Sequence, residues 1–339
     1  LIPSINQNEI FYMKAVNFAK VNSAHLILMN FESPNWFNEY SPSKRDENEW
    51  NHWMLTSRHC SAILSNASEG TKYAKQFYTE TPSDCFFEDI NPAINQMVAD
   101  TILEKKYKKQ KRILMFTRFA MAEHKGASNI CDIISDAMNG YTLVFMIGLG
   151  SVPNDIKEEI TNKAALHNVT IHFRHTLSDR QKFKELAISE LILFPSFFEG
   201  YGYPPVEAVY CGTPCIAFDL PVLRETCEDN LHYVPIGDWA AFRDKIKYVL
   251  NSSASTKCPE HLLNIASFKN YSQKLNNLIA KIDSMDLPYE AELISPNYER
   301  NAVACSGTGH FPKGLTSVVK RLLPKSVYKR LENAYHRSK

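Results

Sequence analysis

The spacing of apolar and polar residues is most regular in the second half of the chain. Short apolar runs at 113–116, 141–147 and 169–173 have the length of buried strands, and 155–167 has the pattern of a helix between two of them. Strands that alternate with helices form right-handed crossovers around a parallel sheet. The pattern therefore predicts a doubly wound α/β domain, whose ligand binds at the carboxyl ends of its strands.

The same alternation continues toward residue 285. We expect further strands at 191–194 and 214–218, and helices at 127–138, at 178–187, from 205 onward and at 265–285. The strand at 191–194 is joined to the next helix by a turn that contains two glycines. This turn is therefore expected at the ligand-binding edge of the sheet.

The first 107 residues have a weaker pattern. We expect helices at 8–21 and 47–60, short buried strands at 25–29 and 61–64, and an aromatic loop at 31–40. Asn91 and Pro92 combine a capping side chain with a first-turn proline, which predicts a helix from there to about residue 105. The basic stretch 105–112 fits a linker. We therefore divide the chain into a domain 1–107, a domain 108–285 and a basic, partly helical tail 286–339.

The composition is typical of a globular protein, and it argues against a nucleic-acid partner, a membrane span and a metal site. Of 339 residues, 44% are apolar and 22% are charged, and the net charge of +1 gives no support for nucleic-acid binding. The longest apolar run, 141–150, has about half the length of a membrane-spanning helix. The eight cysteines form no CxxC pair and no metal-ligand spacing, so we expect free thiols in a reducing cytoplasm and no metal site.

The segment 194–207, FPSFFEGYGYPPVE, is the most informative in the chain. Gly200 and Gly202 tolerate backbone angles that other residues resist, and the helix expected after them adds partial positive charge. Backbone N–H groups in such a turn approach an anion closely. Glu199 stands before the turn and Glu207 stands eight residues later, inside the helix. The segment therefore predicts a phosphate-binding turn with two carboxylates at one crevice.

This segment resembles the glutamate–seven residues–glutamate motif of glycosyltransferase family 4, whose members have the two-domain GT-B fold. The family pattern P-S-x-x-E-G-F/Y-G-x-P-x-x-E-A, then x-x-G-x-P-V/C-I, is matched in order by Pro195, Ser196, Glu199, Gly200, Tyr201, Gly202, Pro204, Glu207, Ala208, Gly212, Pro214 and Ile216. The resemblance covers about residues 112–281. It implies an α/β chain with two Rossmann-like domains that face a cleft.

The resemblance implies three candidate catalytic residues. Thr117-Arg118 and Lys125-Gly126 fit the places of the family's arginine and lysine. Arg118 and Lys125 would hold the diphosphate of a nucleotide-sugar donor, since a guanidinium and an ammonium both suit that task. Glu199 would contact the donor sugar near the reacting carbon. Without the motif, Arg118 and Lys125 are also consistent with ordinary cations on the protein surface.

Further residues are implied as donor contacts. Glu207 would accept hydrogen bonds from the ribose hydroxyls, and the turn at 200–203 would line the donor. Arg174 and His175 fall at a strand end where the family contacts the base, although Arg174 replaces the family's common glycine. Glu225 falls where the family often has a glutamate. The donor-binding set is therefore Gly200, Tyr201, Gly202, Tyr203, Glu207, Arg174 and His175.

The N-terminal part departs from the family pattern. The glycine-rich loop that normally follows the family's first strand is absent, and the family's His-Asp pair is replaced by Phe31-Glu32. We therefore expect an incomplete N-terminal Rossmann-like domain with Leu1 inside it, and keep Glu32 as an acceptor-side candidate. Trp50 and Trp53 are expected in the core rather than on an acceptor platform.

The tail at 313–339 has eight Lys or Arg residues and one acid, Glu332, with an apolar stripe at helical spacing. Basic amphipathic helices lie on anionic membrane surfaces, and they also pack on their own protein with a solvated basic face. Both interpretations stay open. The first would place the protein at the inner face of a membrane, on the cytoplasmic side.

The leading hypothesis is a retaining glycosyltransferase that moves a sugar from a UDP- or GDP-sugar to a glycan or lipid-linked acceptor in polysaccharide or glycoconjugate biosynthesis. No DxD-type carboxylate pair stands out, so we expect metal independence and no cofactor besides the nucleotide-diphosphate sugar co-substrate. The alternative is a non-catalytic nucleotide-sugar-binding subunit of a larger complex. Sugar transfer to water or to acceptors distinguishes the two.

Overall fold

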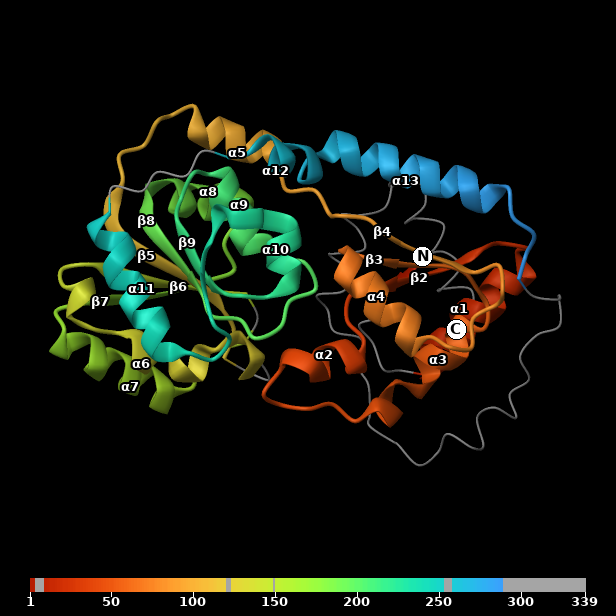
Figure 1. Cartoon of the computed structure of the whole chain (residues 1–339), viewed down its shortest axis with the longest axis horizontal. Helices are drawn as coiled ribbons and strands as arrows, with labels where there is room; N and C mark the ends of the chain where they lie inside the picture. Colours follow the sequence, from red (N-terminus) through yellow and green to blue (C-terminus); the bar gives the residue numbers. More distant parts are fainter. Residues whose placement is uncertain (4–8, 120–122, 149, 253–257, 289–339) are drawn as a thin grey trace. The chain divides into compact units, whose positions relative to one another are not determined.

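The computed structural model describes residues 1–3, 9–119, 123–148, 150–252 and 258–288 (Figure 1). These residues lie in one compact unit and form two parallel β-sheets with helices packed on them. Apart from its first three residues, the expected tail 286–339 lies outside the described part of the chain, and so does the basic segment 313–339.

The first sheet has four parallel strands in the order β1-β2-β3-β4. All six residues of β3 are buried, as expected for a strand that is covered on both faces. The elements of this part are β1 (Ile2–Pro3), α1 (Glu9–Val21), β2 (Leu26–Asn30), α2 (Pro34–Tyr40), the 3-10 helix η1 (Glu47–Trp50), α3 (Asn51–Ser57), β3 (Cys60–Ser65), α4 (Ser68–Phe77) and β4 (Phe86–Asp89).

The second sheet has six parallel strands in the order β10-β9-β8-β5-β6-β7. The chain starts at β5, adds β6 and β7 on one side, and returns to add β8, β9 and β10 on the other. The elements of this part are α5 (Gln96–Leu103), β5 (Gln110–Thr117), η2 (Glu123–Lys125), η3 (Ala127–Asn129), α6 (Ile130–Ile133), η4 (Asp136–Met138), β6 (Thr142–Ile147), α7 (Asn154–Leu166), β7 (Thr170–His175), α8 (Asp179–Ile188), β8 (Ser189–Phe194), α9 (Tyr203–Tyr210), β9 (Cys215–Phe218), α10 (Pro221–Cys227), η5 (Glu228–Asn230), β10 (His232–Val234), α11 (Trp239–Asn251), α12 (Glu260–Ile265) and α13 (Phe268–Asp283).

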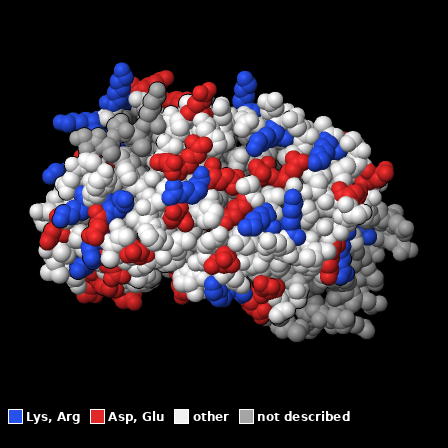
Figure 2. Space-filling view, in the orientation of Figure 1, with Lys and Arg blue, Asp and Glu red and all other residues white. Residues whose placement is uncertain are grey.

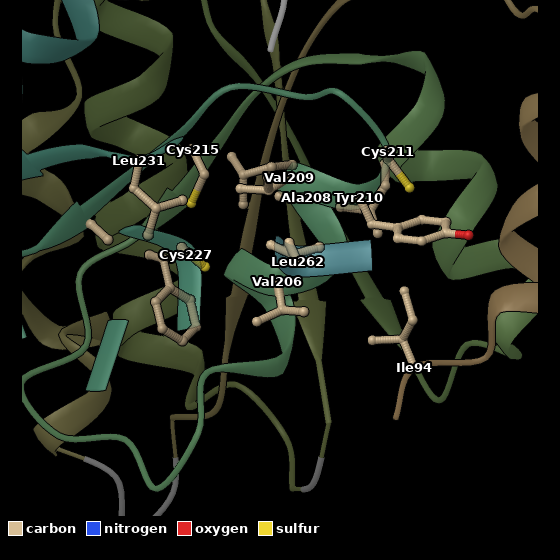
Figure 3. Packing of buried hydrophobic residues seen from close by; sticks show 14 of the residues in the cluster. Ile94, Val206, Ala208, Val209, Tyr210, Cys211, Cys215, Cys227, Leu231 and Leu262 are labelled. Carbon is tan, nitrogen blue, oxygen red and sulfur yellow. The ribbon is translucent and has the colours of Figure 1, made fainter. Parts of the chain in front are cut away.

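The strands of the second sheet bury alternate residues on its two faces. Leu114 and Ile192 join the cluster under α8 and α9, part of which is shown in Figure 3 around Val206, Val209 and Leu262. Their neighbours Ile113 and Leu191 join the opposite cluster, which α6, α7 and α11 cover. The doubly wound arrangement predicted from the alternation of strands and helices is therefore present.

Two helices pack on the sheet of the other predicted domain, not on the sheet of the domain in which we placed them. Helix α5 precedes β5, but Ala99 and Ile102 on it belong to the core of the second sheet. Helix α13 follows that sheet, yet its Leu278 and Ile282 pack against residues of the first sheet, such as Leu64. The packing thus crosses, in both directions, the division that we placed at residue 107.

Two expected elements near the N-terminus were wrong. The aromatic stretch 31–40 is not a loop throughout, because Pro34 begins helix α2 and its buried Trp36 and Phe37 anchor one face. The helix expected from Asn91 begins only at Gln96. The side chain of Asn95 caps it by accepting from the N–H of Val98, whereas Asn91 donates to the carbonyl of Asn66.

The helix expected at 127–138 is divided into η3, α6 and η4, because Ile134 and Ser135 are extended. Burial of Ile130, Ile133 and Met138 against the sheet outweighs the local helical preference. Trp50 and Trp53 are 3% and 0% exposed, which confirms their place in the core.

Charges on the face shown in Figure 2 are mixed, with acidic and basic side chains interspersed. None of the described helices has the length and the apolar character needed to cross a lipid bilayer. The described cysteines are free thiols, and Cys60, Cys211, Cys215 and Cys227 are buried.

Candidate functional site

The order of the second sheet defines a topological switch point between β5 and β8. These strands are neighbours, but the chain leaves them toward opposite sides of the sheet. In open parallel sheets the ligand binds at such a switch point, outside the carboxyl ends of the strands. Arg118 follows β5 directly, and the turn at 195–202 follows β8. The residues selected from the sequence motif are therefore concentrated at the expected edge.

Two loops at this edge are fastened to each other. The N–H of Phe197 donates to the carbonyl of His124 at 2.7 Å, and the Ser196 hydroxyl lies 3.2 Å from the same oxygen. Gly126 has a left-handed φ of +64°, and a Cβ there would overlap the carbonyl oxygen of Pro195. Only glycine permits this approach at low cost. We call the contact between residues 123–126 and 195–198 the loop clamp.

The loop clamp sets Lys125 beside Glu199. The Lys125 Nζ lies 2.5 Å from Glu199 Oε1, and the two side chains are 19% and 13% exposed. Two of the three candidate catalytic residues, which are 74 positions apart in the chain, thus form an ion pair.

The third candidate, Arg118, belongs to a group of cations around His124. Burial, reinforced by the charges of Lys125, Arg118 and Arg45, lowers the pKa of His124 to about 3. His124 therefore stays neutral at physiological pH. Among the described residues, the buried Nε of Arg118 has no hydrogen-bond partner. Buried donors are normally satisfied, so this N–H keeps Arg118 a candidate for a ligand contact.

The glycine turn offers a run of backbone donors. Gly202 has φ +89° and its missing Cβ leaves room for Leu223, while a Cβ on Gly200 would lie 2.5 Å from the carbonyl oxygen of Phe31. No partner is recorded within the described chain for the backbone N–H groups from 200 to 203. Pro204 and Pro205 begin α9 without N–H groups. Anion binding at this helix start therefore depends on the turn itself.

The two tyrosines of this turn differ in exposure. Tyr201 is 3% exposed and belongs to the core cluster of the second sheet, whereas Tyr203 is 42% exposed. Their rings meet edge to face with centroids 5.2 Å apart. Tyr201 thus supports the turn, and Tyr203 presents its ring to the surface.

Glu207 lies one turn into α9 and is 3% exposed. Its Oε1 lies 2.5 Å from the Nζ of Lys182 on α8, a residue that sequence reasoning missed. Burial raises the pKa of Glu207, and Lys182 opposes this shift. Burial likewise disfavours the charged form of Lys182, but Glu207 and Asp179 outweigh it and raise the lysine pKa. The structure therefore supports a charged pair.

Arg174 and His175 are not brought to the Glu199 cluster by any recorded contact. Arg174 forms an ion pair with the buried Glu185 of α8, which also holds Arg112 at 2.9 Å. His175 is the exposed last residue of β7. Arg174 therefore ties β7 to α8, and a base contact from either residue stays a prediction.

Glu32, the acceptor-side candidate, lies next to the glycine turn, since it follows Phe31. It forms an ion pair with Arg45 at 2.8 Å. The guanidinium of Arg45 stacks on Phe37, 3.5 Å from the ring centre, and Phe37 in turn packs on His124. Arg45 was also missed, because nothing in the local sequence around it signals this packing.

Glu225 on α10 contacts the start of α4. Its carboxylate accepts hydrogen bonds from the N–H and hydroxyl of Ser68, at 2.8 and 2.7 Å. Carboxylates are stabilising at helix N-termini, so Glu225 caps α4. No group of three or more His, Cys, Asp or Glu residues suited to a metal occurs in the described ranges. Metal independence stays a prediction.

The architecture defines the class of protein. Two α/β units with parallel sheets, the second carrying the site at its switch point, form the GT-B fold. The structure resembles sucrose-phosphate synthase from Thermosynechococcus elongatus, with a TM-score of 0.62 at 15% identity over 77% of this chain and 68% of that one. It also resembles HepE from Anabaena, solved with UDP and glucose, with a TM-score of 0.57 at 15% identity over 82% and 76%. At such identities the likeness shows the fold.

Residues 99–265 match the family model described as glycosyl transferases group 1. This region is therefore similar to the group 1 glycosyltransferases, which confirms the resemblance. The chain is 26% identical over 147 residues to the O-antigen chain mannosyltransferase RfbU of Salmonella typhimurium. The aligned region covers 42% of this chain and 40% of that protein. The match thus spans about two fifths of this relative's length.

Proposed function

We propose that this protein is a retaining glycosyltransferase that moves a sugar from a UDP- or GDP-sugar to a glycan or lipid-linked acceptor. The observation that carries the proposal is the Lys125–Glu199 pair beside the glycine turn at the switch point of the second sheet. This arrangement brings a carboxylate, a cation and unpartnered backbone donors to one place.

The charges fit departure of a nucleoside diphosphate. Its phosphates gain negative charge as the bond to the sugar breaks, and cations and N–H groups that are already aimed at it stabilise that charge. Arg118 and Lys125 would supply the cations, and the turn at 200–203 would supply the N–H groups. A bound diphosphate would compete with Glu199 for Lys125. The freed carboxylate would then face the donor sugar.

Two finer features follow from the same arrangement. With Arg118 and Lys125 on the diphosphate, the proposed reaction needs no metal. In a retaining transfer the acceptor oxygen attacks from the face of the leaving group, and Glu32 lies on the first-sheet side, next to the turn. We propose Glu32 as a hydrogen-bond acceptor for the incoming hydroxyl.

The similar proteins support the substrate class. One is named as a mannosyltransferase of O-antigen chains, and another was solved with UDP and glucose. We therefore place the proposed activity in polysaccharide or glycoconjugate synthesis. The same proposal places the sugar transfer on the cytoplasmic side of a membrane, with the basic segment 313–339 bound to anionic lipids.

Calorimetric titration with UDP and with GDP tests the donor site. One of the two is expected to bind at micromolar concentration. Arg118→Ala should weaken it about 10–100-fold, since a hydrogen bond to a charged group contributes about 1.5–3 kcal/mol. The exposed Lys184 on α8 provides the control Lys184→Ala, for which we expect no change. If the folded protein bound neither nucleotide, the proposal would be wrong.

Transfer distinguishes the enzyme from the non-catalytic alternative. The nucleotide identified by titration selects the donor sugars to be tried, and release of free sugar into water is followed. Release that Lys125→Ala abolishes supports the enzyme. Tight nucleotide binding without release or transfer to any acceptor would favour the nucleotide-sugar-binding subunit.

A further inference from the structure

The pairing of Lys182 with Glu207 carries an inference that rests on the proposed donor site. Glu207 presents two carboxylate oxygens. Lys182 occupies Oε1 at 2.5 Å, and no partner for Oε2 is recorded among the described residues. Glu207 thus keeps Oε2 for a ligand, while Oε1 already accepts one hydrogen bond from the lysine.

Lys182 has a donor to spare. Its ammonium carries three N–H groups, of which one faces Glu207 and one faces Asp179 at 3.3 Å. The side chain is 23% exposed, and no third partner of the ammonium is recorded among the described residues. The pair therefore offers one acceptor and one donor side by side.

The lysine is held firmly in this position. Helix α8 begins with a capping box in which Ser178 and Gln181 satisfy each other's backbone N–H groups. Lys182 follows directly, and its own N–H bonds to the Ser178 carbonyl at 2.9 Å. The contacts with Glu207 and Asp179 hold the ammonium itself, and a side chain that is already held loses less freedom when it binds a ligand. The location is thus preorganised.

A ribose presents two neighbouring hydroxyls, each of which donates and accepts. A carboxylate oxygen beside an ammonium complements such a diol, because one hydroxyl donates to the carboxylate and the other accepts from the ammonium. We propose that Lys182 and Glu207 read the donor's ribose together, with one hydroxyl assigned to each side chain. Lys182 is then a binding and specificity residue of the donor site rather than only a link between α8 and α9.

Deoxynucleotides test this assignment with the unaltered protein first. The nucleotide that binds in the titration above is compared with its 2′-deoxy and 3′-deoxy forms. Each analogue is expected to bind about tenfold more weakly, since a site built around a hydroxyl rejects the ligand that lacks it. If neither deletion changed the affinity while the parent nucleotide bound, this inference would fail and the proposed donor site would stand.

Two variants then assign the hydroxyls. Lys182→Met should remove the penalty for one deoxy form and keep it for the other, and Glu207→Gln should give the opposite pattern. A purely structural ion pair would weaken all three nucleotides by the same factor in both variants. That result would overturn the proposal.

Folding of the variants is checked by thermal denaturation. Loss of one member of a buried pair is destabilising, so Lys182→Gln, which keeps a neutral donor, is measured alongside. Lys184→Met, on the exposed side of the same helix, is the matched control and should keep both penalties. Should Lys182→Gln fold and still discriminate as the unaltered protein does, the amide would be replacing the donor as proposed; full discrimination in folded Lys182→Met would refute the assignment.

Discussion

The two glutamates of the motif are held in the same way on different supports. Glu199 and Glu207 each lie 2.5 Å from a lysine. Glu199 lies in a loop and Lys125 ends the three-residue 3-10 helix η2, and we call them the loop pair, whereas Glu207 and Lys182 come from α-helices. The loop pair is partly exposed on both sides, while the Glu207 side chain is only 4% exposed. We therefore expect the first pair to separate in the proposed reaction and the second to stay a fixed part of the proposed site.

The largest effect is expected at the loop pair. Lys125→Ala should lower the rate of sugar release from the donor about 10²–10³-fold, which is the range for removing one preorganised group that stabilises transition-state charge. Lys182→Met should act mainly on nucleotide affinity. Steady-state kinetics of both variants, with Lys184→Ala as control, measures the contrast. If Lys182→Met lowered the rate more than Lys125→Ala did, the Lys182–Glu207 pair rather than the loop pair would be the one that acts in the reaction.

The next effect concerns the loop clamp. Gly126 and Gly140 have φ of +64° and +74°, but only Gly126 faces a backbone oxygen, while the nearest atom to a Cβ at Gly140 is Lys111 Nζ at 3.9 Å. Both alanine variants incur the left-handed cost, so their difference isolates the clamp. Gly126→Ala should unfold with a free energy about 1–3 kcal/mol lower than Gly140→Ala in chemical denaturation. It should also weaken nucleotide binding, which Gly140→Ala should leave intact. Equal unfolding free energies of the two variants would show that the loops of the clamp move apart at little cost.

The smallest effect is a pH dependence that arises from His124. The pKa of His124 is about 3 in the folded protein and 6.5 for an ordinary exposed histidine, which represents the unfolded chain. Between these two pH values only the unfolded state binds the proton, so the free energy of unfolding decreases as the pH falls. His124→Gln should reduce the loss of unfolding free energy between pH 6.5 and 5 by about 1.5 kcal/mol. Urea denaturation at both pH values measures this. If the unaltered protein and His124→Gln lost the same unfolding free energy between the two pH values, another group would be binding the proton.

Part of this site could be predicted because local sequence fixes it. The turn with Glu199, Gly200 and Gly202 is a contiguous motif between a strand and a helix, and Arg118 is placed by the end of β5. The alternation of strands and helices was enough to predict the second sheet, since each crossover there has one common hand.

The remainder depends on contacts between distant segments. Lys182 and Glu207 meet only because α8 and α9 are neighbours on one face of the sheet, and no spacing between them in the sequence signals it. Arg45 reaches the site through stacking on Phe37. The start of α5 was misplaced because Asn91 and Asn95 both look like caps, and only packing decides between them.

The return of α13 to the first sheet has a consequence for synthesis. The strands of that sheet are synthesised by residue 89, but the helix that covers Ala62 and Leu64 ends at Asp283, roughly 200 residues later. At about 5–20 residues per second, the apolar face of the first sheet then waits on the order of 10–40 s for its cover. We therefore expect the nascent chain to be most prone to aggregation during that interval, before α13 is complete.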